Sequence, residues 1–348
     1  METNPTHAVA SAGFCPKKRA TGMADIQLDE YCRHFARLKR APNRVFPEST
    51  LRKAPHKPLL LLAIMEMIAR GEITSRFISI TGELIELNAL FTAYWRALMP
   101  ITQTTSIAFP FSRLHTEPFW ELVAVPGRQI TRATIDAVSS ISQLRKLALG
   151  ANIDEELFFL MTRPESRSRL VNTLLQSCFS DEGRKILQAE LGVQHQIFQY
   201  SLELEALPHK VAEPQNPIPY NDTVRDQGFR RAIVYCYDHR CALCGVRIVT
   251  PDGHTVVEAA HIKPWSQFKD DDVRNGIALC RLCHWAFDEW LMGVDDNYQV
   301  LLSRHMAISP NAAGFLMTLS GRPIICPQDK ALWPDLGRLA WHRKRMYA

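Results

Sequence analysis

The stretch Cys280-Arg281-Leu282-Cys283-His284 decides the fold of the C-terminal part of this 348-residue chain. Two cysteines separated by two residues and followed by a histidine form the attachment signal of c-type haem. The same spacing is also half of a four-cysteine zinc site. The remainder of the chain has to distinguish these two interpretations, which lead to different functions.

A second cysteine pair favours zinc over haem. Cys241 and Cys244 stand upstream with the same spacing, and the following Gly245 suits a tight turn beneath a metal. Four thiolates from two such pairs form a closed tetrahedral shell, which is structural because it has no open position. A set of buried free cysteines is the alternative. The sequence therefore predicts structural Zn²⁺ held by Cys241, Cys244, Cys280 and Cys283.

The composition fits a globular protein of two domains. Hydrophobic residues make up 46% of the chain and charged residues 22%, which allows two hydrophobic cores. No run of about 18 apolar residues occurs, so no membrane span is predicted. The N-terminal residues lack the apolar core of a signal peptide, and nine cysteines without an export signal favour reduced thiols in the cytoplasm. Haem attachment normally requires export. The net charge of +5 leans toward a polyanionic partner without proving one.

The pattern along the chain predicts an α+β protein with four segments. Residues 1–23 are expected to be a disordered leader, with Met23 as an alternative start, and residues 24–206 form a mainly helical domain. The proline-rich residues 207–220 read as a linker, and residues 221–348 form the second domain.

Local patterns predict the elements of the first domain. Apolar residues at helical spacing predict helices over "IQLDEYCRHFARLKR" (26–40), over "HKPLLLLAIMEMIARG" (56–71) and after Gly82. Residues 133–204 are expected to be helical with turns near Gly150, Pro164 and Gly192. The alternating segment "FPFSRLHTEPFWELVAV" (109–125) predicts a hairpin that turns at Glu117-Pro118.

Between the cysteine pairs the chain resembles the McrA-type branch of the HNH nucleases. The residues that carry the resemblance are "EAAHIKPW" (258–265), "NGIALCRLCHWAFDEW" (275–290) and "MGVDDNYQVLLS" (292–303). The resemblance implies a ββα-metal module that hydrolyses DNA phosphodiester bonds. It makes His261 the general base and His284 a ligand of catalytic Mg²⁺ or Mn²⁺. Asn275 is expected either to hydrogen-bond the backbone beside His261 or to touch the metal.

The residue types also suit this chemistry. Phosphodiester hydrolysis needs an activated water and a Lewis acid at the departing oxygen, and a neutral histidine takes a proton from water near pH 7. His261 ends the expected strand "TVVEAAHI" (255–262), and His284 starts a helix that the zinc site anchors.

One position departs from the family pattern. Ala260 stands where many HNH enzymes have an acid, so Glu258 is the candidate carboxylate for the metal or for a neighbouring ligand. Asp288, one helical turn after His284, is expected to orient that histidine. An ordinary surface role is the alternative for Glu258 and for Asp288.

Over about residues 27–190 the first domain resembles the DNA sulfur-binding domains of phosphorothioate-dependent restriction enzymes. The segments "HKPLLLLAIMEMIARGEI" (56–73) and "FPFSRLHTEPFWEL" (109–122) carry this resemblance. Sulfur in place of a phosphate oxygen is larger and less hydrated, so its recognition needs an apolar contact ringed by cations. The resemblance implies that Pro110 touches the sulfur. The residues expected to contact DNA are His56, Lys57, Phe109, Pro110 and, from weaker matches, Arg52 and Arg113.

The predicted partner is therefore double-stranded DNA that carries phosphorothioate. Cleavage of both strands predicts a homodimer or paired encounters, because one HNH site cuts one strand at a time. The segment "WHRKRMY" (341–347) fits either phosphate contact or a solvated terminal helix. Two other functions stay open at this point: an HNH endonuclease that reads methylated or hydroxymethylated cytosine, and a non-catalytic zinc protein that binds DNA.

Overall fold

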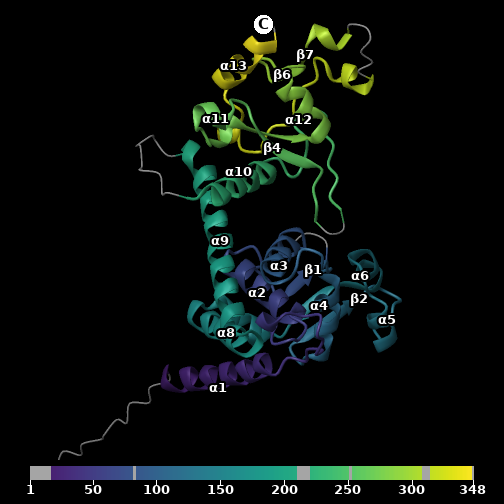
Figure 1. Ribbon diagram of the computed structural model, residues 1–348, viewed down its shortest axis with the longest axis vertical. Coiled ribbons are helices and arrows are strands. Elements are labelled where there is room, and N and C mark those ends of the chain that lie inside the picture. The colour runs from purple at the N-terminus through teal and green to yellow at the C-terminus, as the bar shows by residue number, and fades with distance from the viewer. Residues whose placement is uncertain (1–16, 81–83, 210–219, 251–252, 308–313, 347–348) are drawn as a thin grey trace, which may run out of the picture. The chain divides into compact units, whose positions relative to one another are not determined.

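The structure is a computed structural model that describes residues 17–80, 84–209, 220–250, 253–307 and 314–346 (Figure 1). The chain divides into two compact units. Unit 1 comprises Met1–Glu83 and Ala108–Arg184, and unit 2 comprises Leu84–Ile107 and Lys185–Ala348. The predicted leader and linker lie outside the described residues over 1–16 and 210–219, and helix α1 (Lys17–Ala36) begins within the segment predicted as leader.

Unit 1 is built around helix α2 (His56–Ala69). Each residue from Leu59 to Met65 is at most 1% exposed, and the helix is apolar on every side, as a central buried helix requires. Pro58 stands in its first turn, where the missing backbone donor costs no hydrogen bond. Helices α4 (Ala108–Arg113), α7 (Glu155–Thr162) and α8 (Pro164–Cys178) pack against α2, and α1 packs along α8. The helix predicted over residues 56–71 is thus confirmed.

A three-stranded antiparallel sheet completes unit 1. Strand β3 (Ala148–Ile153) lies between β1 (Phe77–Ser79) and β2 (Trp120–Ala124). Gly150 stands in the middle of β3, where an added Cβ would lie 2.3 Å from the carbonyl oxygen of Ile78. The glycine therefore permits a close approach within the sheet, and the turn predicted at this position was wrong.

The hairpin predicted over residues 109–125 was also wrong. Its first half forms helix α4 and a 3₁₀ turn (Leu114–Thr116), and strand β2 pairs with β3 instead. A helix of six residues is too short to display a 3.6-residue period, and Pro110 is tolerated near a helix start. The alternation of Phe109 and Phe111 therefore imitated a strand. Helices α5 (Arg132–Asp136) and α6 (Ile141–Leu147) follow in the same unit.

Unit 2 contains α3 (Leu84–Leu98), most of α9 (Asp181–Ala206), and α10 (Asp222–Cys236). Figure 1 shows α9 as one continuous helix. Residues 181–206 are helical throughout, and Gly192 is among them. An added Cβ at Gly192 would meet no atom within 4 Å, and an exposed glycine costs a helix only about 1 kcal/mol. The turn predicted at Gly192 was therefore wrong.

The second half of unit 2 has the order strand, strand, helix. β4 (Val257–His261) pairs antiparallel with β5 (Gly276–Cys280), which places His261 opposite Gly276. Helix α12 (Arg281–Asp288) follows β5 directly, and α10 packs against both strands. The loop between the strands holds the short helix α11 (Trp265–Phe268). The predicted α+β fold with a helical N-terminal part and a strand–strand–helix module in the C-terminal part is confirmed.

A second hairpin and a terminal helix enclose α12. Strands β6 (Met292–Val294) and β7 (Val300–Leu302) pair antiparallel, and α13 (Leu336–Met346) packs on β6. His342 of α13 is buried, and its ring stacks on Phe287 of α12 at 3.7 Å between centroids. Across the parts of the chain that the structure describes, no helix has the length and apolar character needed to span a membrane.

Candidate functional site: a four-cysteine cluster beside a histidine cavity

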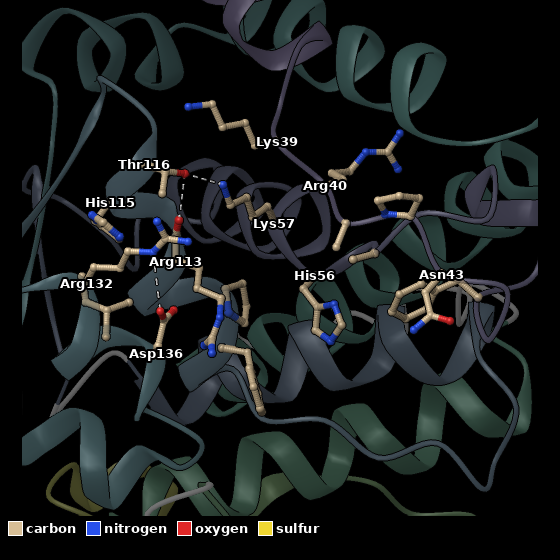
Figure 2. Close-up of a pocket in the computed structure, with 17 residues that line it drawn as sticks. Lys39, Arg40, Asn43, His56, Lys57, Arg113, His115, Thr116, Arg132 and Asp136 are labelled. Atoms are coloured by element: carbon tan, nitrogen blue, oxygen red, sulfur yellow. Dashed lines mark hydrogen bonds and ion pairs between the residues drawn. The ribbon is translucent and has the colours of Figure 1, made fainter.

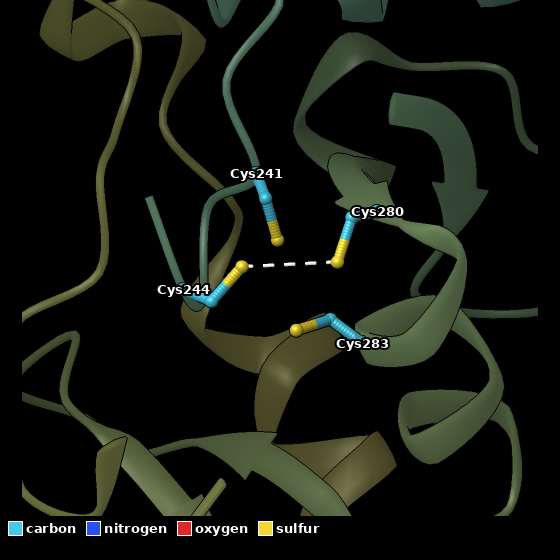
Figure 3. A group of neighbouring side chains, drawn as sticks. All are labelled: Cys241, Cys244, Cys280 and Cys283. Atoms are coloured by element: carbon cyan, nitrogen blue, oxygen red, sulfur yellow. Dashed lines mark hydrogen bonds between the residues drawn. The ribbon is translucent and has the colours of Figure 1, made fainter. Parts of the chain in front are cut away.

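The four cysteines of the two C-x-x-C pairs converge in unit 2. Cys241 and Cys244 lie in the loop after α10, Cys280 ends β5, and Cys283 lies in the first turn of α12. Their sulfur atoms lie within 4.8 Å of one another, and Figure 3 shows the four thiols pointing toward a common centre. Gly245 takes the left-handed conformation, with φ of 77°, that the turn after the first pair requires.

The cluster fits a tetrahedral metal. The Sγ atoms of Cys244 and Cys280 are 3.7 Å apart. Zn–S bonds of about 2.3 Å in a tetrahedron place neighbouring sulfurs about 3.8 Å apart. Both thiols of the second pair face those of the first, which is the arrangement of a metal site. No thiol of the second pair is then available for a bond to haem. Across the described residues, these cysteines are the one group of three or more His, Cys, Asp or Glu side chains with such convergence.

His261 and His284 line one cavity of about 350 Å³ beside this cluster, here called the unit 2 cavity. His261 comes from the end of β4, and His284 lies in α12, next in sequence to Cys283. Because Cys283 belongs to the metal cluster, a bound metal would fix the helix that carries His284. The cavity wall also contains Ala259, Ile262, Pro264, Trp265, Phe287, Asp288, Trp290 and His342.

Two carboxylates flank His284 on opposite sides of its ring. Oε2 of Glu258 lies 3.2 Å from Nδ1, and Oδ2 of Asp288 lies 3.4 Å from Nε2. Asp288 lines the unit 2 cavity with a side chain that is 60% exposed, and partial desolvation raises the pKa of its carboxyl group. Glu258 does not line the cavity and also contacts the exposed Arg281 at 3.4 Å. The structure thus brings both predicted carboxylates to His284, one from inside the cavity and one from outside it.

Asn275 is a structural clamp in this arrangement. Its side chain is fully buried; Nδ2 donates to the carbonyl oxygens of Lys263 (3.1 Å) and Asp270 (2.8 Å). Its Oδ1 accepts from the backbone N–H of Lys263 at 2.9 Å, and its own carbonyl accepts from Ile262 at 2.8 Å. Of the two roles expected for Asn275, this geometry matches the hydrogen bonds to backbone beside His261.

Sequence reasoning missed the carboxylate that contacts His261. Oδ1 of Asp271 lies 2.9 Å from Nε2 of His261, and the imidazole stacks on Phe229 with 3.9 Å between centroids and 4° between planes. The signal in the sequence was the run of three aspartates at 270–272. Nothing in that run indicated which of the three faces the histidine.

Near the unit 2 cavity, two cations lie against aromatic rings. The Nζ atom of Lys269 lies 3.5 Å from the ring centroid of Trp265, which lines the cavity. The guanidinium of Arg345 lies 3.5 Å from the ring centroid of Trp341, which contacts Phe268 edge to face at 5.1 Å. We call Lys269, Trp265, Phe268, Trp341 and Arg345 the aromatic–cation rim.

Unit 1 contains a larger cavity, of about 650 Å³, which we call the unit 1 cavity (Figure 2). The predicted DNA-reading residues His56, Lys57, Phe109, Pro110 and Arg113 all line it. Arg52 does not; it is exposed and pairs with Glu48 at 2.5 Å. The lining residues that the sequence prediction did not include are Lys39, Arg40, Ala41, Pro42, Asn43, Phe46, Ala54, His115, Thr116, Arg132, Ile135 and Asp136.

Burial changes the charges of the ionisable groups around the unit 1 cavity. Burial and the neighbouring Arg113 lower the pKa of His56 to about 4, so at neutral pH this ring is uncharged. Burial also lowers the pKa of Lys57, whose Nζ pairs with Glu117 at 2.5 Å and donates to Thr116 at 2.8 Å. The guanidinium of Arg113 lies over the ring of Phe109, 4.7 Å from its centroid. A neutral His56 offers the cavity a ring surface and a nitrogen rather than a charge.

Comparisons with known proteins match the N-terminal and the C-terminal parts of the chain to two different families. Residues 38–196 match the family described as "ScoMcrA-like, DNA sulfur-binding domain", and residues 241–295 match the family described as "HNH endonuclease". No curated protein matches the chain.

Two solved structures resemble the chain weakly. One is a modification-dependent TagI restriction endonuclease, 23% identical, with a TM-score of 0.26 over 36% of this chain. The present chain spans only 39% of that protein's length. The other is the type IV phosphorothioation-dependent restriction endonuclease ScoMcrA, 11% identical, covering 91% of this chain and 86% of that one at a TM-score of 0.24. Scores this low carry no argument, so identification depends on the two family matches. They show that the chain contains a region of the ScoMcrA-like DNA sulfur-binding family, residues 38–196, and a region of the HNH endonuclease family, residues 241–295.

Proposed function

We propose that this protein is a cytoplasmic endonuclease that recognises phosphorothioate in double-stranded DNA and cuts nearby. The observation that carries the proposal is the cavity shared by His261 and His284, in a chain that also has a sulfur-binding domain. Zn²⁺ at the four cysteines and catalytic Mg²⁺ or Mn²⁺ are the metals that we propose.

His261 is the general base in this proposal. Among the described residues, Nδ1 of His261 makes no hydrogen bond, whereas Nε2 lies 2.9 Å from Oδ1 of Asp271. A neutral imidazole with one free nitrogen takes a proton from a water that attacks phosphorus. Asn275 holds the loop that follows His261, so the ring keeps its place at the end of β4.

His284 and Asp288 are the proposed ligands of the catalytic ion. Both line the unit 2 cavity, and an imidazole nitrogen with a carboxylate oxygen is a common donor pair for divalent metals. When bound, the ion supplies Lewis-acid assistance to the departing oxygen. Glu258, on the other nitrogen of His284, orients the ring as carboxylates behind metal-binding histidines commonly do.

The unit 1 cavity is the proposed site for the modified phosphate. Phe109 and Pro110 offer apolar surface to sulfur, and the neutral His56 adds to that surface without attracting ordinary phosphate strongly. Arg113 supplies positive charge for the anion, and its contact with Phe109 holds the guanidinium in the cavity wall. This combination favours a poorly hydrated anion over a well hydrated one.

The aromatic–cation rim is the proposed path of the strand that is cut. Lys269 and Arg345 lie against indole rings, which limits their motion and so reduces the entropy lost when they bind phosphate. Trp265 belongs both to the rim and to the cavity wall, so a phosphate held there is close to His261. Because one HNH site cuts one strand, we propose that two copies act together on a duplex.

The test is cleavage of one DNA sequence with and without a phosphorothioate, in the presence of Mn²⁺. We expect cutting of the modified duplex alone, and a loss of at least about 10³-fold in kcat for His261→Ala. The matched control is His254→Ala, because His254 is an exposed histidine of the same unit outside the cavity.

Two results would contradict the proposal. Equal cutting of plain DNA, or preferential cutting of DNA with methylated or hydroxymethylated cytosine, would overturn the assignment of the mark. Full activity of His261→Ala, or binding without cleavage under every divalent metal, would overturn the catalytic assignment.

A further inference from the structure

The carboxylate of Asp271 has a protein partner on each of its oxygen atoms. Oδ1 lies 2.9 Å from Nε2 of His261, and Nη1 of Arg225 lies 3.0 Å from Oδ1 and 2.9 Å from Oδ2. The hydroxyl of Tyr200 donates to Oδ2 at 3.0 Å. The side chain is 8% exposed. The protein thus surrounds this one carboxylate with donors from α9, α10 and β4.

These donors keep Asp271 ionised. Burial alone would raise its pKa, but hydrogen bonds from His261, Arg225 and Tyr200 outweigh burial, so its pKa is lowered. Burial and the adjacent Asp271 raise the pKa of Tyr200, so its hydroxyl remains a donor. A carboxylate can only accept, and the proton between Asp271 and His261 therefore belongs to Nε2 of the imidazole.

The neighbouring aspartates have different partners. Asp270 accepts from Nε of Arg338 at 2.9 Å, and Asp272 accepts from Arg274 at 2.6 Å. Arg274 lies in the same loop as Asp272, which also accepts from Nη2 of Arg338 at 3.3 Å. Among the described residues, no hydrogen bond joins Asp270 or Asp272 to His261. Of the three consecutive aspartates, Asp271 is the one that the structure aims at His261.

We propose that Asp271 is a positioning residue for His261, and that Arg225 and Tyr200 hold it in place. This inference rests on the proposed role of His261 as general base. With the proton on Nε2 and the ring stacked on Phe229, Nδ1 presents its lone pair.

In the reaction, Nδ1 takes a proton from water and the water oxygen forms its bond to phosphorus. The bond from phosphorus to the departing oxygen breaks, and that oxygen takes a proton from solvent. Asp271 stays ionised and stabilises the imidazolium. The imidazolium later returns its Nδ1 proton to solvent, which restores the starting state.

The test compares Asp271→Asn with Asp270→Asn in the full-length protein. Asparagine keeps the size of the side chain but can donate to Nε2, which favours the tautomer with the proton on Nδ1. We expect Asp271→Asn to lower kcat by about 10²-fold or more with little change in KM or in DNA affinity. Asp270→Asn removes a neighbouring carboxylate that pairs with Arg338, and it should stay within about threefold of the unsubstituted protein.

A spectroscopic readout separates positioning from folding. Nitrogen-15 NMR distinguishes the two neutral tautomers of an imidazole, and the His261 signals are those absent from His261→Ala. We expect the Nε2–H tautomer in the unsubstituted protein and the Nδ1–H tautomer in Asp271→Asn. Tyr200→Phe keeps the ring and loses one donor to Asp271, so its kcat should fall by about threefold to tenfold.

Two outcomes would overturn the inference: kcat of Asp271→Asn equal to that of the unsubstituted protein, or the same His261 tautomer in both. Either result would leave His261 as base if His261→Ala is inactive. Activity of His261→Ala would instead contradict the proposed function itself. Equal zinc content and thermal midpoint in Asp271→Asn and Asp270→Asn show that both variants are folded.

Discussion

The two cavities use ionisable side chains in opposite ways. The unit 1 cavity, about 650 Å³, contains a histidine made neutral by burial and a lysine already paired with Glu117. The unit 2 cavity, about 350 Å³, has His261 and His284 in its wall, each with a carboxylate partner on the ring. Recognition of a poorly hydrated anion requires limited charge and apolar surface, whereas proton transfer requires groups that change protonation in a fixed geometry. The difference fits the two proposed roles, anion recognition in the unit 1 cavity and catalysis in the unit 2 cavity.

The largest expected effect comes from breaking the metal cluster beside the unit 2 cavity. Cys283→Ser removes a thiolate from the cluster and loosens the helix that carries His284. Structural zinc contributes about 10 kcal/mol or more to folding in small metal domains. We expect loss of bound zinc by elemental analysis and a fall of at least about 10³-fold in cleavage. Cys326→Ser is the matched control, since Cys326 is a cysteine of the same unit outside the cluster. Full zinc content in Cys283→Ser would contradict this prediction.

The next largest effect distinguishes the roles of Asp288 and Glu258, the two carboxylates that contact His284. Asp288→Asn removes a proposed ligand, and we expect the Mn²⁺ concentration for half-maximal cleavage to rise by about 10²-fold. Glu258→Gln removes the contact outside the cavity, and we expect a rise of about tenfold. A larger effect for Glu258→Gln would reverse the two assignments.

A smaller effect is expected from the charge in the unit 1 cavity. Arg113→Ala should weaken binding of phosphorothioate DNA by about tenfold. It should also reduce the slope of the logarithm of the binding constant against the logarithm of the salt concentration by about one. The control is Arg52→Ala, which removes an exposed arginine of the same unit outside the cavity. Fluorescence anisotropy over a series of salt concentrations measures both. Equal losses for the two variants would show that the cavity makes no specific contribution.

The smallest expected effect is on the pH dependence of DNA binding, and it tests whether His56 of the unit 1 cavity is neutral. Because the pKa of His56 is lowered to about 4, the ring stays neutral from about pH 5.5 to about pH 8. Binding of phosphorothioate DNA by His56→Gln and by the unsubstituted protein should therefore show the same pH dependence in this range. The folded protein binds fewer protons at His56 than the unfolded chain below about pH 6.5. Stability should thus fall on acidification toward pH 4, and less so in His56→Gln, as urea unfolding measures.

The sequence was informative where chemistry fixes residue spacing. The C-x-x-C pairs and the order His261, Asn275, His284 predicted the metal cluster and the HNH module, because ligands and catalytic groups tolerate little change. It was less informative where packing chooses between alternatives. The six-residue helix α4 has too few residues to show its period, and Gly150 and Gly192 serve a strand and a helix.

Contacts between residues that are distant in the sequence were the second feature that the sequence did not predict. Asp271 meets Tyr200 across 71 positions of sequence, a contact that no local pattern encodes. The neutral state of His56 likewise depends on burial in the folded unit, which the local sequence does not reveal.

If the two proposed metals bind, the adjacency of Cys283 and His284 predicts that a chelator inhibits cleavage in two separable ways. Withdrawal of the ion at the open carboxylate and imidazole site should be fast and should reverse on addition of magnesium or manganese alone. Withdrawal of zinc from the closed thiolate shell should be slow, and recovery should then require zinc, reduced thiols and refolding of α12. The time course of inactivation and the ion that restores cutting therefore report on the two metals individually.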